Sequence, residues 1–310
     1  MNYLFIPRMK VLGASASGSS YTIGIPSMIA WLGMMYAMQR KLREKYYPNI
    51  TFRSAGVCYH KVKVNRFKPE NGYKYSIIGS RNPLVGKNAG PRSFMELPTL
   101  NMDVDLIFAF DGLDVDEMCD DSFIEAVINT LHNLRACGGT ITSIGKTKPH
   151  VYTQSDEDKL KQMMIPGYTV IERRDLLING ESDNDIDRML DVLASYSNAK
   201  RDDNHNFEKW EYSKKQKGWI IPIGVGYKGI SPLGYVENQR NKKYPHRFVE
   251  AITTLGECKM PISLDSITDM MWHYEYNEDE ALYLGVNQKF NRDFFIAMKM
   301  ADIIASFYNR

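Results

Sequence analysis

The sequence lacks the features that mark secreted and membrane proteins. It contains no uncharged apolar run of 18 residues, which argues against an ordinary membrane-spanning helix. Its first residues, MNYLFIPR, have neither the basic region nor the long apolar stretch of a signal peptide. Four scattered cysteines with no CxxC pair fit a reduced protein better than a disulfide framework or a zinc site. These absences predict a cytoplasmic globular protein that makes no membrane contact.

Acidic residues are scarce in the first third of the chain. Residues 1–100 contain 15 Lys and Arg against 3 Asp and Glu, a net charge of +12. Residues 101–200 reverse this balance, with 9 against 19 and a net charge of −10, while residues 201–310 carry 15 of each kind. A first third this basic predicts a polyanionic partner. The acidic middle third indicates either solvated helix faces or a basic protein neighbour.

Residues 3–43 have the pattern of a strand, a loop and a helix. An apolar strand at 3–6 precedes a polar loop from 13 to 22. Beyond the loop, apolar residues from Met28 to Leu42 recur at the spacing of one buried helical face. Small residues ahead of an exposed helix N-terminus can cradle an anion, although a plain scaffold has the same pattern. The candidate contacts in this stretch are Arg8, Gly24, Pro26 and Ser27.

A second candidate surface lies at residues 50–64. In a regular strand, Tyr59, Lys61 and Lys63 would share one face and His60 would lie on the other. An aromatic ring among lysines on an open sheet face suits single-stranded RNA, because the ring stacks on a base and the lysines meet phosphates. An ordinary exposed strand face is the alternative interpretation.

Residues 66–98 are basic and rich in glycine and proline. They contain six Lys and Arg against two Glu. The pattern predicts a β-hairpin that has too few apolar residues for a core of its own and therefore lies on a partner. Its candidate contacts are Arg81, Asn82 and Arg92.

The predicted elements of residues 1–180 run strand, helix, strand, basic hairpin, strand, helix, strand. This order matches the ferredoxin-like plan, which also underlies the RNA-recognition motif, with the hairpin inserted midway. We expect an α+β fold in which helices cover one sheet face and leave the other for RNA. Residues 181–310 are expected to add helices and a glycine-rich loop, packed with the first domain as one unit, and the polar stretch 198–217 is expected to be mobile. Helices are predicted at 183–193, 248–255, 264–271 and 294–308.

Two glycine-rich segments resemble nucleotide-binding motifs, but neither has both the spacing and the following helix that its motif requires. Residues 139–147 have five residues between the glycines where a P-loop needs four, and Lys148-Pro149 follows where a helix should begin. Residues 224–229 fit GxGxxG after a strand, but Pro232 follows too soon for the required helix. A glycine-rich loop close to a nucleic-acid backbone, or a bulged turn, explains the second segment better. Its candidate contacts are Gly226, Tyr227 and Ser231.

No catalytic or metal-binding constellation stands out. The six histidines are dispersed, and His60 is a candidate acid or base only if the protein cleaves RNA without a metal. The acidic residues between 111 and 121 fit a helix start better than a metal site. The sequence therefore predicts neither a metal nor a cofactor.

Several short stretches, taken in order over about residues 4–290, resemble one family. They are Phe5–Arg8, Thr22–Ser27, Ala37–Arg40, Ser80–Leu84, Leu134–Gly139, Ile165–Tyr168, Gly218–Ile223, Gly226–Tyr227, Ile230–Leu233, Arg247–Glu250 and Met271–Tyr274. The set is similar to the second Csy subunit of the type I-F CRISPR surveillance (Cascade) complex, a Cas-five-type RAMP protein. Residues 198–217 and 294–310 depart from the family pattern.

The resemblance implies a ferredoxin-like RAMP fold with a hairpin thumb and a non-catalytic role in antiviral defence. The protein would hold the 5′ handle of the CRISPR RNA and form a heterodimer with the large Csy subunit. It would also neighbour a backbone Csy subunit and meet target DNA through the complex, in which base pairing reads the sequence. Two rival functions stay open: a RAMP endoribonuclease that cleaves CRISPR repeat RNA through His60, and a nucleotide-using enzyme built on the glycine-rich segments.

Overall fold

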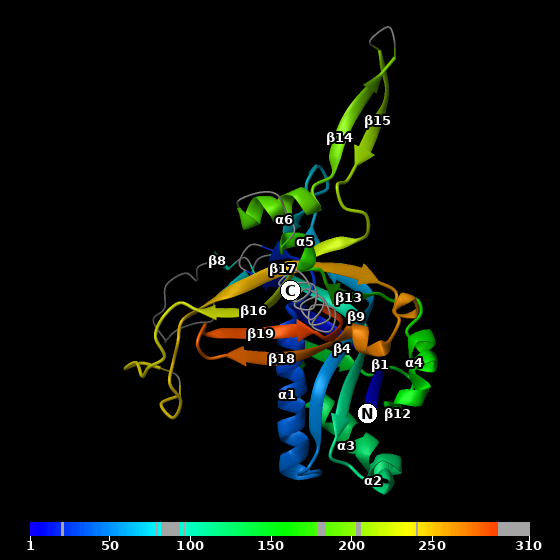
Figure 1. The fold of residues 1–310 in the computed structure, drawn as a ribbon, viewed down its shortest axis with the longest axis vertical. Coiled ribbons are helices and arrows are strands. Elements are labelled where there is room, and N and C mark those ends of the chain that lie inside the picture. Colours follow the sequence, from blue (N-terminus) through cyan, green and yellow to red (C-terminus); the bar gives the residue numbers. More distant parts are fainter. Residues whose placement is uncertain are drawn as a thin grey trace, which may run out of the picture.

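One large antiparallel sheet organises the protein. The computed structural model describes residues 1–19, 22–78, 80–81, 94–95, 97–178, 184–202, 206–239 and 241–290. In the sheet the strands follow the order β10-β11-β1-β9-β4-β18-β19-β16-β17-β13, and β12 pairs with β1 (Figure 1). The strands are β1 (Asn2–Ser15), β4 (Thr51–Val64), β9 (Thr99–Asp111), β10 (Arg135–Ala136), β11 (Gly139–Ser143), β12 (His150–Thr153), β13 (Thr169–Glu172), β16 (Ile220–Gly229), β17 (Val249–Lys259), β18 (Met271–Asn277) and β19 (Leu282–Asn287).

Two helices cover one face of the N-terminal part of this sheet. Helix α1 (Met28–Lys45) connects β1 to β4, and α3 (Asp121–His132) lies between β9 and β11 in the chain. The even-numbered residues from Leu100 to Phe110 of β9 face these helices and join Trp31 in the larger core. Periodicity alone predicted both helices and this strand, and the structure confirms them.

The acidic stretch before α3 serves to start helices. Asp114 forms a capping box with Glu117 at the start of α2 (Val115–Cys119), and the Asp120 carboxylate accepts a hydrogen bond from the Ser122 amide at the start of α3. These carboxylates satisfy backbone N–H groups that have no partner within the helix. The interpretation of this stretch as a helix start is therefore confirmed.

A second, smaller core lies on the opposite face of the sheet. It joins Tyr3, Phe5 and Ile107 to α4 (Glu157–Met163) and to two 3-10 turns, Pro261–Ser263 and Ile267–Met270. Among the residues that the structure describes this cover is partial, and Arg8, Lys10, Lys61 and Lys63 on the same face of β1 and β4 are exposed. None of the helices in the described part of the chain is long and apolar enough to cross a membrane.

The C-terminal half extends the same sheet instead of forming a helical segment. A helix was predicted at 248–255, but Val249–Lys259 form the strand β17, because the β-branched residues Val249, Ile252, Thr253 and Thr254 favour extended backbone. Only a 3-10 turn forms within 264–271, and 294–308 lies outside the described residues. Strand β13, at the far end of the sheet, returns to β4, where Tyr59 and Tyr168 exchange both backbone hydrogen bonds.

Two other segments stand apart from the large sheet. Within 66–98, β5 (Arg66–Phe67) pairs with β6 (Ser76–Ile77), and the backbones of β7 (Ser80–Arg81) and β8 (Phe94–Met95) pair antiparallel, while Asn82 and Arg92 lie outside the described residues. Beyond α5 (Asp175–Ile178) and α6 (Asp185–Leu193), β14 (Tyr196–Arg201) and β15 (Phe207–Ser213) form a hairpin. Part of the polar stretch 198–217, which was expected to be mobile, therefore lies in two paired strands. The remaining short strands are β2 (Ser17–Ser19) and β3 (Thr22–Ile23).

Candidate nucleic-acid interface

A bulge in β1 turns basic side chains toward the open sheet face. Pro7 has no N–H to give to the sheet, and Arg8 adopts a left-handed backbone conformation with a φ of 51°. The Arg8 amide leaves the strand ladder and donates to Asp105 Oδ1 at 2.6 Å. Its guanidinium lies 3.2 Å from Asp103 Oδ2 on the open face.

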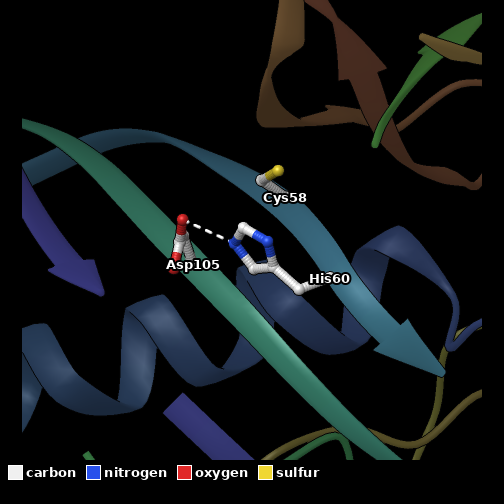
Figure 2. Close-up of side chains that lie close together, drawn as sticks. All are labelled: Cys58, His60 and Asp105. Carbon is white, nitrogen blue, oxygen red and sulfur yellow. Dashed lines mark hydrogen bonds and ion pairs between the residues drawn. The ribbon is translucent and has the colours of Figure 1, made fainter. Parts of the chain in front are cut away.

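A second bulge lies directly across β9, in β4. Tyr59 pairs with Val104 and Lys61 with Asp103, so His60 is the extra residue. His60 Nε2 lies 2.7 Å from Asp105 Oδ2, and Figure 2 shows the ring pointing from β4 to that carboxylate on β9. Asp105 thus holds the bulges of both neighbouring strands, one with each carboxylate oxygen.

His60 is bound on both sides by hydrogen-bond acceptors. Its Nδ1 lies 2.7 Å from the Pro166 carbonyl oxygen, opposite the carboxylate of Asp105, and its side chain is 3% exposed. Burial lowers the pKa of His60, but the hydrogen bond to Asp105, the charge of Asp105 and the Pro166 carbonyl outweigh burial and raise the pKa. The Pro166 carbonyl can only accept, so Nδ1 donates to it, and the contact of Nε2 with the Asp105 carboxylate favours a second proton on the ring.

The β4 bulge separates two residues that were expected to share a face. Tyr59 points into the larger core, where its hydroxyl accepts a hydrogen bond from Trp31 Nε1 at 2.9 Å and burial raises its pKa. Lys61 points to the opposite, open face beside Asp103. The prediction that Tyr59 stacks on a base is therefore wrong, because an inserted residue reverses the alternation of side chains beyond it.

Four exposed cations gather on the open face. Asp103 of β9 pairs with Lys10 of β1 on one side and with Lys61 of β4 on the other, and opposite residues share a face. Lys63 lies two residues beyond Lys61, opposite Asn101. We call the surface formed by Arg8, Lys10, Lys61 and Lys63 the basic face. Lys10 was not among the contacts predicted from the sequence, although it lies only two residues beyond Arg8 in the same strand.

The residues just before α1 are tied to strand β16. Ser27 Oγ donates to the Gly224 carbonyl at 2.9 Å, and Pro26 is buried. Pro26 lies just before α1, which begins at Met28. A Cβ at Gly24 would meet no heavy atom of the described residues within 4 Å, so this is an open position.

The predicted glycine-rich loop is a strand. Gly226 and Tyr227 lie inside β16, between β17 and β19, and a Cβ at Gly226 would overlap the Tyr283 carbonyl oxygen. The glycine is needed for strand packing, since only a residue without a side chain fits there. Ser231 follows the strand and accepts a hydrogen bond from the Phe248 amide at 2.9 Å. Of the predicted loop contacts, the side chain of Tyr227 is exposed.

The polar atoms around His60 also have the composition of a metal site. Ligand atoms of Cys58, His60 and Asp105 lie within 4.8 Å of one another. However, His60 and Asp105 bind each other, and the Cys58 thiol contacts the Met164 carbonyl at 3.6 Å. Burial raises the pKa of Cys58, which favours the protonated thiol that metals do not bind. We interpret the three residues as a structural cluster at the bulges of β1 and β4, inside the sheet.

Comparison with known proteins identifies the family. The sequence model of the family described as CRISPR-associated protein (Cas_Csy2) matches residues 4–285. The chain belongs to the Csy2 family of CRISPR-associated proteins. The CRISPR-associated protein Csy2 of Pseudomonas aeruginosa (strain UCBPP-PA14) is 24% identical over 316 residues, which cover 93% of this chain and 95% of that protein. The family resemblance drawn from the sequence is confirmed.

Proposed function

We propose that this Csy2-family chain is a non-catalytic, RNA-binding subunit of a type I-F CRISPR interference complex. It holds the 5′ handle of the CRISPR RNA and pairs with the large Csy subunit, next to a backbone Csy subunit. The observation that carries the proposal is the basic face, where Arg8, Lys10 and Lys61 adjoin Asp103 and Lys63 lies two residues further along β4. Cations on an open sheet are suited to the phosphates of a single strand.

The fold assigned to this function is a ferredoxin-like RAMP domain with residues 181–310 packed on it as one unit. The strand order β11-β1-β9-β4, with α1 after β1 and α3 after β9, supports the assignment. Residues 66–98 are the thumb, and Arg81, Asn82 and Arg92 reach the junction of handle and spacer from there. The paired backbones of β5 with β6 and β7 with β8 support a hairpin-like insertion.

The basic face and the residues before α1 divide the contacts to the handle. Lys10 and Lys61 neutralise phosphates, while Gly24 leaves room for the RNA backbone beside the start of α1. Tyr227 is the exposed aromatic side chain among the originally predicted contacts and offers a stacking surface. Tyr59 has no part in this interface, because its ring is in the core.

Repeat-RNA cleavage by His60, the main rival function, is disfavoured by the same geometry. A general acid or base must reach the proton that it transfers. The His60 side chain is 3% exposed, and both ring nitrogens already face acceptors, Asp105 and the Pro166 carbonyl. We assign His60 to holding the β4 bulge.

Co-expression with the other Csy subunits and a CRISPR RNA tests the proposal. The wild-type chain is expected to co-purify with RNA that has one fixed 5′ end, and the double variant Lys10→Ala/Lys61→Ala to retain much less. Arg40→Ala is the matched control, because it removes an exposed cation from α1, outside the basic face. RNA retention by the double variant equal to that of Arg40→Ala would remove the basic face from the site. A defined cleavage product that is lost in His60→Ala would instead establish the rival function.

A further inference from the structure

One buried carboxylate connects the two strands that carry the basic face. The side chain of Asp105 in β9 is 1% exposed, and each of its oxygens has a partner in a different neighbouring strand. The Arg8 amide of β1 donates to Oδ1 at 2.6 Å, and His60 Nε2 of β4 lies 2.7 Å from Oδ2. Asp105 therefore joins the two points at which β1 and β4 gain a residue relative to β9.

The four cations of the basic face lie at these bulges or just beyond them. Arg8 is part of the β1 bulge and Lys10 lies two residues further on, while Lys61 follows His60 directly and Lys63 lies two residues beyond Lys61. Inserting or removing one residue of a strand reverses the face on which the later side chains lie. The β4 bulge therefore decides that Lys61 and Lys63 lie on the open face and not on the side of α1.

The surroundings of Asp105 leave no substitute for its contacts. The His60 ring bridges the carboxylate to the Pro166 carbonyl, and a Cβ on Gly167 would overlap the Cys58 sulfur and lie 3.0 Å from His60 Cε1. A buried amide or ring nitrogen that loses its partner costs free energy. Loss of the carboxylate should therefore release both bulges instead of leaving their polar atoms unpaired.

We propose that Asp105 is a positioning residue for RNA binding: through the two bulges it aligns the cations of β1 and β4 for one RNA strand, and protonation of His60 tightens this alignment. The inference rests on the proposed function, because it takes the basic face as the surface that binds handle RNA. Asp105 is buried and acts through Arg8 and Lys61, which lie on the exposed side.

Protonation matters because the His60 ring faces two acceptors. A carboxylate and a carbonyl are both satisfied only when both ring nitrogens carry a proton. The other charged or titratable groups that face the ring are Arg8 from β1 and the Cys58 thiol from β4, whose own pKa is raised by burial. Burial and the Arg8 charge oppose protonation of His60, but the contacts with Asp105 and Pro166 outweigh them and raise its pKa above about 6.5.

Deprotonation of His60 removes one of its two contacts and loosens the β4 bulge. RNA affinity should therefore be highest below about pH 6.5 and should fall as the pH rises through the folded pKa of His60. Lysine and arginine keep their charges over this range, so the basic face itself does not titrate.

Two substitutions of Asp105 test the inference on the chain with its large subunit, through binding of fluorescently labelled handle RNA. Asp105→Leu removes both contacts and should bind at least about tenfold more weakly, with a slope of log affinity against log salt reduced by about 1.4, the value of two phosphate contacts. Asp105→Asn should rescue binding, because its oxygen accepts from the Arg8 amide and its nitrogen donates to a neutral His60 ring. The wild type should lose at least about threefold in affinity between about pH 6 and about pH 8.5, and Asp105→Asn should not.

Gln39→Leu is the matched structural control. Gln39 of α1 accepts a hydrogen bond from the Phe52 amide at 2.6 Å and so holds the other bulge of β4, between Phe52 and Ser54. Buried residues from Ser54 to Tyr59 fix the strand between the two bulges. Gln39→Leu should therefore lower the melting temperature and leave the salt slope of RNA binding unchanged.

The β14–β15 hairpin provides the control for exposed rings. Phe207, Trp210 and Tyr212 are 54%, 53% and 73% exposed, and the rings of Phe207 and Trp210 lie 5.5 Å apart. We call the surface formed by these three residues the aromatic face. Figure 1 shows the hairpin projecting from the rest of the protein, and the lysines of its two strands lie within 3.7 Å of glutamate carboxylates. Trp210→Ala/Tyr212→Ala should bind handle RNA as the wild type does.

A folded Asp105→Leu variant with the wild-type salt slope overturns the inference, and so do pH profiles that are the same for the wild type and Asp105→Asn. If Asp105→Leu does not fold, the comparison of these two pH profiles decides. Wild-type RNA binding by Lys10→Ala/Lys61→Ala would instead defeat the proposed function. Loss of RNA binding in the lysine variant without any effect of the Asp105 variants would leave the proposed function standing and remove only the positioning role.

Discussion

Strands β4 and β15 both contain an aromatic residue close to lysines, yet their rings occupy opposite environments. Tyr59 of β4 is 7% exposed and is hydrogen-bonded by Trp31, whereas Trp210 of β15 is 53% exposed. Helix α1 packs over β4, and every residue of β14 and β15 is exposed. Alternation therefore sorts side chains onto two faces, and the rest of the fold decides which face is buried.

The largest expected effect on the free energy of unfolding comes from removing the ring of Tyr59, and removing the ring of Trp210 provides the comparison. Tyr59→Ala should lower the free energy of unfolding by about 3–5 kcal/mol, as loss of a buried aromatic side chain does. Trp210→Ala should change it by less than about 0.5 kcal/mol, because the ring is on the surface. Urea unfolding monitored by circular dichroism measures both. Equal losses in the two variants would mean that the hairpin packs against the protein body.

Two glycines extend the comparison from side chains to backbone. A Cβ at Gly224 would overlap the Gly18 carbonyl oxygen, whereas one at Gly24 would meet no heavy atom of the described part of the chain within 4 Å. Gly224→Ala should therefore cost about 1–3 kcal/mol, the usual effect of overpacking. Gly24→Ala should cost less than about 0.5 kcal/mol and still weaken RNA retention. Full RNA retention by Gly24→Ala would show that the RNA backbone does not pass close to Gly24.

The bulge at His60 gives the smallest effect, which appears in the pH dependence of stability. Because the folded pKa of His60 is raised, the protonated ring stabilises the fold most below its ordinary pKa of about 6.5. This stabilisation is lost as the pH rises through the folded pKa. The free energy of unfolding of the wild type should therefore fall above about pH 6.5 relative to that of His60→Gln. Parallel pH profiles for the two proteins would contradict an imidazolium at this position.

Local patterns in the sequence predicted the elements that have one strong periodicity. Helix α1, helix α3 and strand β9 formed close to where the apolar spacing placed them. The helix prediction at 248–255 was wrong because Val249, Ile252 and Leu255 also fit a helical spacing, although the β-branched residues of this stretch favour a strand. The hairpin at 196–213 was missed because its polar composition outweighed the alternation of Phe207, Trp210 and Tyr212, which was the available signal.

The candidate interface was predictable in charge but not in geometry. The excess of cations in residues 1–100 pointed to a polyanion, and Arg8 and Lys61 do lie on one open face. The placement of Tyr59 depended on a bulge that Asp105 holds from a strand some 45 residues further along the chain. A long-range contact of this kind leaves no trace in the local alternation. Long-range pairing also explains part of the acidic excess in residues 101–200. Asp103, Asp105 and Asp111 pair with basic residues of β1 and β4.

The central claim is that the basic face meets RNA phosphates while the aromatic face does not. The salt dependence of handle-RNA binding by the chain with its large subunit tests this directly. Each lost phosphate contact should reduce the slope of log affinity against log salt by about 0.7, so Lys10→Ala/Lys61→Ala should reduce it by about 1.4. Trp210→Ala/Tyr212→Ala should leave the slope unchanged. A slope that the lysine variant does not alter, or that the hairpin variant does, would contradict the account.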